Sequence, residues 1–173
     1  LDKETELKQL EVMKAINENP NRKVDIATTF LGAHAVPTEY KGKEDDYIDF
    51  LIKEMLPLIQ EKKLAEHCDI FCEKGVFTVE QSRRLLQAAK DKGFGIKIHA
   101  DEIVSFGGAE LAGELQALSA DHLLHASDAG IQAMADNHVV ATLLPLTAFT
   151  LREPYARGRE MIDRGCAVAL AAD

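Results

Sequence analysis

The stretch GIKIHADE, residues 95–102, combines a short apolar run with a cluster of polar residues directly after it. Gly95–His99 has the length and apolar content of a buried strand, whereas the turn that follows, up to Glu102, adds two carboxylates beside the histidine. An amphipathic pattern over Thr78–Lys92 precedes the run; it opens with a capping-box sequence and stops before a glycine. Another helical pattern follows over Ala109–Leu118. We therefore predict the order helix, strand, polar turn, helix for this part of the chain.

The same alternation runs along the whole chain. Six short apolar runs predict strands: Val24–Leu31, the residues around Ile70–Cys72, Gly95–His99, Ala120–Leu124, Val139–Leu144 and Ala167–Ala172. Apolar spacing and capping residues predict helices: Lys3–Ile16, Tyr47–Glu61, Thr78–Lys92, Ala109–Leu118, Ser127–Asp136 and Pro154–Arg164. Strands that alternate with helices form a parallel α/β sheet. A doubly wound sheet and a (β/α)8 barrel both fit this order, and six strands would be roughly three quarters of a barrel.

The composition excludes several classes of protein. Hydrophobic residues fill 46% of the 173 positions, which is enough for a folded core, and no apolar run approaches the length of a membrane-spanning helix. With 20 basic and 29 acidic residues, the net charge is −9, which argues against a nucleic-acid partner. Three cysteines without a disulfide-framework spacing favour a reducing, cytoplasmic setting.

Polar residues stand where most of the predicted strands end. They are His34 after the first strand, Cys72–Gly75 after the second, His99–Glu102 after the third, Asp121 and His122 after the fourth, and Asp173 after the sixth. Active sites of parallel α/β folds form at the carboxyl ends of the strands. Because Asp101 and Glu102 crowd the same turn as His99, this turn is the strongest candidate for binding a divalent metal.

Other residues have simpler interpretations. We expect three histidines to lie on the surface, at helix ends or in loops: His67, His125 and His138. Cys68 and Cys72 point to the same face of one strand and are expected in the core. Gly107-Gly108 matches no nucleotide-binding fingerprint, so we expect a turn into the next helix, whose amides could meet an anion.

Seven segments of the chain carry motifs that occur together in one enzyme family. The most specific are Lys97–Glu102, Gly107–Ala112 and Ser119–Leu123. The others are Thr29–Pro37, Phe71–Phe77, Leu143–Pro145 and Val168–Asp173. Together these segments resemble the imidazolonepropionase family of the amidohydrolase superfamily, over essentially the whole chain.

This resemblance implies a metal-dependent (β/α)8 barrel hydrolase, which opens the ring of 4-imidazolone-5-propanoate with water to give N-formimidoyl-L-glutamate. The predicted strands would be strands three to eight, so that residues 1–173 form a partial amidohydrolase barrel domain. One Zn²⁺ or Fe ion is implied, with His99 of the fifth strand and Asp173 of the eighth among its ligands. His34 and Glu102 are implied to contact substrate, and His122 to polarise it or orient the water. The implied partner is this small molecule, in the cytoplasm and without a membrane; a homodimer is compatible with the resemblance.

The implied residues have a chemical logic in ring opening. The attacked ring carbon belongs to a lactam-like carbonyl, which reacts poorly with neutral water, and a metal lowers the pKa of bound water from 15.7 toward about 7. Asp173 would accept the proton of that water and deliver it to the departing ring nitrogen. His122 would stabilise the developing oxyanion, and Glu102 completes the implied catalytic group.

The chain lacks parts that the resemblance calls for. Residues 1–173 contain neither the His-x-His pair that supplies two further metal ligands, nor the first two barrel strands, nor the small β domain of family members. The chain also opens on Leu1 without an initiator methionine and ends on Asp173, directly after a predicted strand. We therefore expect a segment of a longer protein, and we expect this segment alone to be inactive.

Two alternatives remain open. One is a related amidohydrolase that removes ammonia from a nucleobase-like ring with the same metal frame. The other is a non-catalytic α/β module that binds a partner or a small ligand. Ammonia release in place of ring opening would identify the first, and a gene that begins at Leu1 and stops at Asp173 would favour the second.

Overall fold

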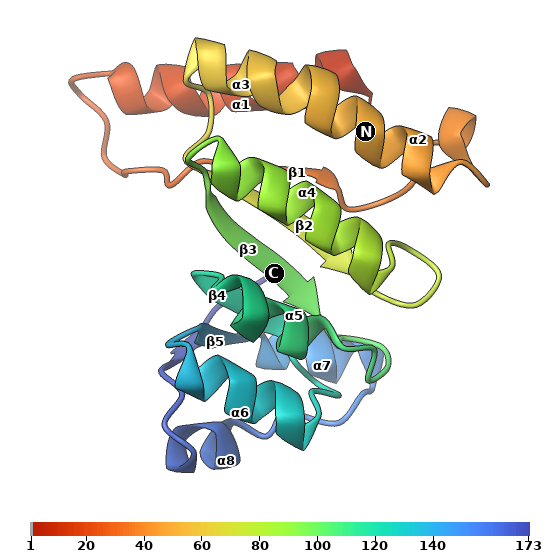
Figure 1. The fold of residues 1–173 in the computed structure, drawn as a ribbon. Coiled ribbons are helices and arrows are strands. Elements are labelled where there is room, and N and C mark those ends of the chain that lie inside the picture. The colour runs from red at the N-terminus through yellow and green to blue at the C-terminus, as the bar shows by residue number, and fades with distance from the viewer. Residues whose placement is uncertain (1) are drawn as a thin grey trace.

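A computed structural model describes residues 2–173 and contains a sheet of six parallel strands with helices packed against it (Figure 1). The strands are β1 (Thr29–Ala33), β2 (His67–Cys72), β3 (Gly95–Ala100), β4 (Ser119–His122), β5 (Val140–Leu143) and β6 (Val168–Leu170). The helices are α1 (Lys3–Glu18), α2 (Glu44–Phe50), α3 (Leu56–Lys62), α4 (Val79–Asp91), α5 (Gly108–Leu115), α6 (Asp128–Asp136), α7 (Pro145–Leu151) and α8 (Gly158–Asp163). A short 3-10 helix, η1 (Thr38–Tyr40), precedes α2, and a π-helical segment, η2 (Leu51–Met55), joins α2 to α3.

The strands pair in the order of the sequence. Each neighbouring pair from β1 to β6 is parallel. A doubly wound sheet reverses its strand order at a switch point, and this sheet does not reverse. The predicted parallel α/β fold is confirmed, and its strand order is that of a (β/α)8 barrel.

Side-chain alternation gives this sheet two different faces. Along β2 and β3, every second residue is fully or almost fully buried: Cys68, Ile70, Cys72, Ile96, Ile98 and Ala100. Helix α4 packs on these two strands and α5 on β3 and β4 (Figure 1). The prediction that Cys68 and Cys72 lie in the core is therefore confirmed. The residues between them point to the opposite face, since successive side chains of a strand alternate.

Local capping signals predicted the starts of two helices. The hydroxyl of Thr78 accepts a hydrogen bond from the Gln81 amide (3.2 Å), and the Gln81 side chain accepts one from the Thr78 amide (2.9 Å). This reciprocal capping box starts α4. Ser127 starts α6 by accepting a hydrogen bond from the Gly130 amide (2.9 Å).

The first strand begins later than predicted. The prediction Val24–Leu31 is wrong at both ends, because β1 spans Thr29–Ala33. The backbone of Ile26 is instead paired with the side chain of Asn17, which donates to its carbonyl (2.7 Å) and accepts from its amide (2.9 Å). Because this side-chain amide from α1 satisfies the backbone, the residues before Thr29 do not need a strand neighbour.

The predicted helix Tyr47–Glu61 is a continuous run of α2, η2 and α3. Pro57 lies within it and has no amide to donate to the preceding turn. The π-helical segment ends at Met55, two residues before this proline, which lies in the first turn of α3, where an amide hydrogen bond is not needed.

Several boundaries in the second half of the chain also differ. Strand β4 ends at His122, two residues earlier than predicted, because His122 and Leu123 have φ angles of 73° and 61°. Helix α7 was not predicted, although Pro145 is a favoured first residue of a helix. The last helix begins at Gly158 rather than Pro154.

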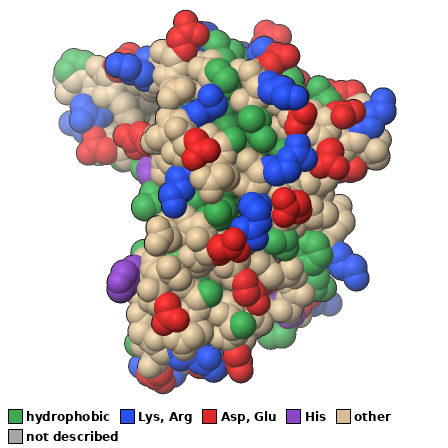
Figure 2. Space-filling model, in the orientation of Figure 1, with side chains coloured by type: hydrophobic (Ala, Val, Ile, Leu, Met, Phe, Trp, Pro, Cys, Tyr) green, Lys and Arg blue, Asp and Glu red, His purple; other side chains and the backbone are tan. Residues whose placement is uncertain are grey.

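The outer helices carry intermixed charges (Figure 2). Arg83 of α4 forms an ion pair with Glu114 of α5, and Arg84 pairs with Asp45 and Asp49 of α2. Such exposed pairs contribute about 0–1 kcal/mol each, so they orient neighbouring helices more than they stabilise them. Among residues 2–173, no helix combines the length and the apolar character needed to cross a bilayer.

The capping box of α4 gives a stability prediction. Thr78→Ala removes the acceptor for the Gln81 amide and should lower the free energy of unfolding by about 1 kcal/mol. The measurement is the shift in the urea midpoint at constant slope. Thr150→Ala is the matched control: the hydroxyl of this exposed threonine donates to the Leu146 carbonyl within α7, and its loss should change stability by less than about 0.5 kcal/mol. Equal shifts for both variants would contradict the assignment of the cap.

Candidate functional site

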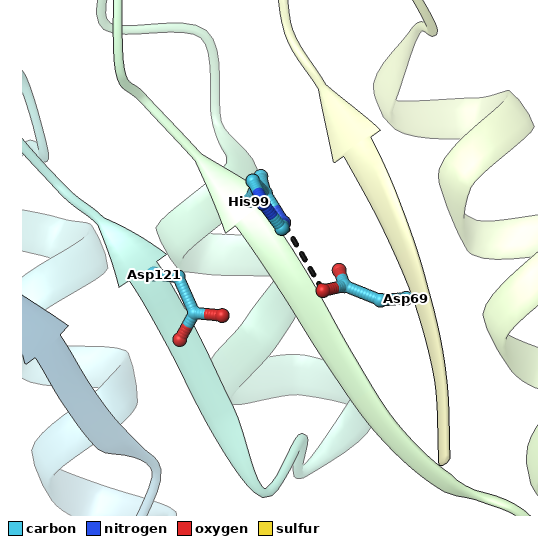
Figure 3. A group of neighbouring side chains, drawn as sticks. All are labelled: Asp69, His99 and Asp121. Atoms are coloured by element: carbon cyan, nitrogen blue, oxygen red, sulfur yellow. Dashed lines mark ion pairs between the residues drawn. The ribbon is translucent and has the colours of Figure 1, made fainter. Parts of the chain in front are cut away.

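Three ionisable side chains meet on the face of the sheet opposite α4 and α5. Asp69 comes from β2, His99 from β3 and Asp121 from β4, and the two aspartates lie on either side of the histidine (Figure 3). One ligand atom from each residue lies within 4.8 Å of the other two. His99 pairs directly with Asp121 in the sheet, and its partner on β2 is Phe71. Asp69 lies two residues before Phe71, so it approaches the histidine diagonally.

Asp69 is held between the backbone and His99. Its Oδ1 accepts a hydrogen bond from the Ile70 amide (2.7 Å), and its Oδ2 lies 3.1 Å from Nδ1 of His99. That distance is within ion-pair range, although the ring nitrogen is not aligned for a hydrogen bond. Burial acts to lower the pKa of His99, but the carboxylates of Asp69, Asp121 and Glu102 outweigh it, and the pKa is raised.

His122 and Glu102 form a second pair next to this group. The His122 ring centroid lies 5.2 Å from that of His99, and its Nδ1 lies 3.6 Å from Oε1 of Glu102. Strict alternation would send the side chain after Asp121 toward the helices, but His122 has a φ of 73°. Its burial lowers the pKa of His122, while Glu102 opposes this change. The neutral imidazole is therefore the main form at neutral pH.

His34 reaches the same face through an irregularity in β1. Two residues of β1, Leu31 and Gly32, lie opposite one residue of β2, because Phe30 pairs with Cys68 and Ala33 with Ile70. This extra residue moves His34 into the set that faces away from α4 and α5. Its ring stacks on Phe71 with centroids 5.4 Å apart and lies 5.9 Å from His99.

Asp173 lies beyond the end of β6 and is exposed. Its Oδ2 accepts a hydrogen bond from Thr147 of α7 (3.1 Å). Its negative charge acts on His122, where it opposes the lowering of the pKa by burial. Within residues 2–173, the group with ligand atoms at mutual short distance consists of Asp69, His99 and Asp121, without Asp173.

The predicted site residues thus fall into a contiguous set and one neighbour. Short contacts link four of them: His34, His99, His122 and Glu102. Asp173 lies beyond the end of another strand, and its charge acts on His122. A cavity of about 640 Å³ opens beside the set. Its lining includes His34, Asp69, Lys97, His99 and Asp121, together with residues of α1.

Unsatisfied buried atoms test whether this site suits a metal. Within the described chain, Oδ1 of Asp121 is buried and has no hydrogen-bond partner, whereas the unpartnered Nδ1 atoms of His99 and His122 face the carboxylates of Asp69 and Glu102. Buried polar atoms are almost always partnered, so their presence here needs an explanation. Imidazole nitrogens and carboxylate oxygens are ligands for Zn²⁺ and Fe. The donor set fits a divalent cation.

Asp101 does not belong to the site. It is fully buried and has a φ of 51°, and its carboxylate accepts hydrogen bonds from four backbone amides. These belong to Phe106 (2.7 Å), Gly107 (3.0 Å), Gly108 (3.3 Å) and Ala109 (2.9 Å). Burial raises the pKa of Asp101, and the amides act in the opposite direction. The interpretation that Asp101 shares a metal with His99 is therefore wrong, and the glycine amides meet an anion that the chain itself supplies.

The remaining histidines match their predictions only in part. His67 was expected in a loop or at a helix end, which is wrong, because it is the first residue of β2 and half-buried. His138 is exposed in a loop, as predicted. His125 is half-buried in a loop, where its Nε2 lies 3.4 Å from Glu153.

Sequence reasoning missed Asp69 and gave Asp121 no role. Asp69 is almost completely buried, in a strand whose neighbouring residues are mostly apolar. A lone carboxylate inside a predicted buried strand was the available signal, since burying a charge is costly unless it is paired.

The chain is similar over its whole length to proteins named imidazolonepropionase. It is 79% identical to the one from Phocaeicola vulgatus and 74% identical to that from Bacteroides thetaiotaomicron, in each case over 173 residues and all of this chain. The relative from Clostridium tetani is 62% identical over the same length. The chain spans about two fifths of these relatives, 41–42% of their length. The resemblance seen in the sequence motifs is confirmed. No family model matches the chain.

Solved structures share the fold at low sequence identity. Guanine deaminase from C. acetobutylicum aligns with a TM-score of 0.67 and 15% identity, covering 100% of this chain and 44% of that one. An Arabidopsis N6-mAMP deaminase aligns with a TM-score of 0.65 and 10% identity over 84% of this chain and 41% of its own. A mutant of atrazine chlorohydrolase from Arthrobacter aurescens, complexed with zinc and atraton, aligns at 0.53 with 16% identity over 72% and 32%. These similarities support the α/β fold.

The role of Asp101 gives a prediction about stability. Asp101→Ala leaves four amides at the start of α5 without their acceptor and should lower the free energy of unfolding by about 3 kcal/mol or more. Urea denaturation measures the loss. Asp91→Ala, which removes an exposed carboxylate from the end of α4, should change stability by less than about 0.5 kcal/mol. If Asp101→Ala is as stable as this control, the anchoring role is wrong.

Proposed function

We propose that the protein carrying this chain is an imidazolonepropionase, a hydrolase acting on a C–N bond of a cyclic amide. It would open the ring of 4-imidazolone-5-propanoate with water to give N-formimidoyl-L-glutamate. The observation that carries the proposal is the 79% identity to an imidazolonepropionase across all 173 residues. The contiguous arrangement of His34, His99, His122 and Glu102 at the strand ends supports it.

Residues 1–173 would form part of an amidohydrolase barrel domain, namely strands three to eight. The consecutive parallel order of β1 to β6 supports this division. The first two strands and a small β domain would come from the rest of the protein. The same division explains why two expected metal ligands, a His-x-His pair, do not occur in this chain.

A divalent ion, Zn²⁺ or Fe, would be held by His99 and Asp173 together with ligands from outside the chain. The unpartnered buried Oδ1 of Asp121, on the strand next to His99, supports an ion at this place. When bound, such an ion supplies the Lewis acidity that makes water a nucleophile at neutral pH. His99 thus belongs both to the proposed ligand set and to the group that it forms with Asp69 and Asp121.

The chain's own residues would then divide the work of ring opening. Asp173, exposed at the end of β6, would accept the proton of the attacking water and deliver it to the ring nitrogen that leaves. His122 would donate a hydrogen bond to the carbonyl oxygen as negative charge develops there. Its lowered pKa supports a neutral ring with a single N–H, which this hydrogen bond uses; Glu102 lies 3.6 Å from Nδ1, and its charge opposes the lowering of the pKa.

Substrate binding would fall to His34 and Glu102. His34 is exposed at the end of β1, and its ring is fixed by stacking on Phe71. The substrate is a small molecule, and the cavity beside His34 and His99 has room for one. The homodimer and the cytoplasmic location stay predictions.

The test is a product assay with the full-length protein. We expect loss of the imidazolone absorbance with formation of N-formimidoyl-L-glutamate, at a rate that depends on bound metal. Guanine, as a nucleobase-like ring, should release no ammonia. Ammonia release without ring opening would replace the proposal by the deaminase alternative, and binding without turnover of either compound would favour the non-catalytic module.

His99 is the residue whose loss tests the site most directly. In the full-length protein, His99→Ala should remove most of the bound metal and nearly all ring opening, because one imidazole ligand is lost. Metal content is measured by elemental analysis alongside the rate. His67→Ala, on the neighbouring strand at its opposite end, is the control and should retain metal and activity. Full metal occupancy in His99→Ala would contradict the ligand role.

A further inference from the structure

We propose that Asp69 is a positioning residue for His99: its carboxylate fixes the imidazole through Nδ1, so that Nε2 is the nitrogen that binds the metal. The inference rests on the proposed function for the presence of a metal at His99. It adds a role for a residue that the sequence motifs did not single out.

The location of Asp69 demands a partner. It lies inside β2, it is 4% exposed, and the next residues along the strand on either side, Cys68 and Ile70, are fully buried. An isolated carboxylate in such a place loses its hydration, a cost of several kcal/mol unless other groups compensate. Two groups do so here: the amide of Ile70 and the ring of His99.

The two contacts of Asp69 use different carboxylate oxygens, so the backbone fixes the carboxylate through one oxygen and leaves the other for His99. The Ile70 amide donates to Oδ1 (2.7 Å), which ties the carboxylate to the rigid strand. Oδ2 is thereby left facing Nδ1 of His99 at 3.1 Å (Figure 3). Hydrogen bonds in such sites are often poorly aligned before a ligand is present, and we expect this one to tighten when an ion is bound.

The chemistry of imidazole completes the inference. A neutral ring has one N–H donor and one acceptor nitrogen, so a carboxylate at Nδ1 selects the tautomer with the proton on that atom. The lone pair for a metal then resides on Nε2. Carboxylates that hold ligand histidines in this way orient the ring and strengthen it as a donor, and their loss typically lowers metal affinity about 10–100-fold.

Other buried acids near His99 do not provide this contact. Asp101 and Glu73 are both fully buried, but their carboxylates bind backbone amides of the loop after β3. Asp121 is the direct partner of His99 across the strands, yet its Oδ1 has no hydrogen-bond partner within residues 2–173. Asp69 is therefore the carboxylate whose placement is explained by the ring.

The experiment measures metal affinity in the full-length protein by competition with a chelator, using Zn²⁺ as the probe. Asp69→Asn keeps the size of the side chain but removes the charge, and Asp69→Ala removes the contact. We expect Zn²⁺ affinity to fall about 10–100-fold for Asp69→Ala and by a smaller factor for Asp69→Asn. The absorption spectrum of the Co²⁺-substituted protein should shift in both variants, because the geometry of a ligand changes.

Two controls separate positioning from folding. Asp136→Asn removes an exposed carboxylate from the end of α6 and should leave Zn²⁺ affinity unchanged. The thermal midpoint of each metal-free variant shows whether the fold is retained. If Asp69→Ala is unfolded, the Zn²⁺ affinity of Asp69→Asn provides the test. Zn²⁺ affinity within twofold of the wild type in a folded Asp69 variant, with an unchanged Co²⁺ spectrum, would overturn the inference.

The result is separable from the proposed function. Ring opening by the wild-type protein tests the substrate, whereas the affinity ratio between variants tests Asp69. A wild type that binds Zn²⁺ but does not open the imidazolone ring would remove the proposed function and leave the role of Asp69 standing. Normal ring opening by the wild type, together with unchanged Zn²⁺ affinity in the Asp69 variants, would support the proposed function and remove the role of Asp69.

Discussion

Parallel strands that pair in sequence order bring their carboxyl ends to one edge of the sheet, and the site depends on this constraint. Because side chains alternate along each strand, one set packs under α4 and α5 and the other faces the opposite side of the sheet, where the site lies. On β3 the first set contains the buried Ile96 and Ile98, and the second set ends with His99. A slip of one residue in the pairing would exchange the two sets and would bury His99 against the helices. The core and the site are therefore specified by the same register.

Two of the site's side chains reach it through local departures from this regularity. The extra residue in β1 redirects His34, and the positive φ of His122 allows its ring to lie near that of His99. Bulges and uncommon backbone conformations weaken an element locally, and they concentrate where function requires a particular side-chain direction. In this protein both departures stand at the carboxyl ends of strands.

Buried carboxylates that bind backbone amides position Glu102. Asp101, directly before it, anchors the amides at the start of α5, and Glu73 accepts a hydrogen bond from the amide of Ile103, directly after it (2.8 Å). The residue between these two anchors is thus placed beside His122. The acidic residues of the region therefore have two roles. Asp101 and Glu73 bind backbone amides and fix the loop after β3. Asp69 and Glu102 lie near the imidazoles and affect their pKa values.

The sequence by itself determined the features that depend on near neighbours. Periodicity predicted six strands and most helices, and the capping residues Thr78 and Ser127 marked the helix starts, because caps and periodicity act within a few residues. The motifs around His99 and His122 also pointed to the imidazolonepropionases that the chain resembles over its whole length. Only the tertiary structure decided which aspartate lies beside His99. Asp101, two residues after His99 in the sequence, turns to the amides of its own loop. Asp69, from the neighbouring strand, lies next to the ring. Sequence spacing cannot reveal that choice, because it depends on strand register and on which buried amides still lack an acceptor.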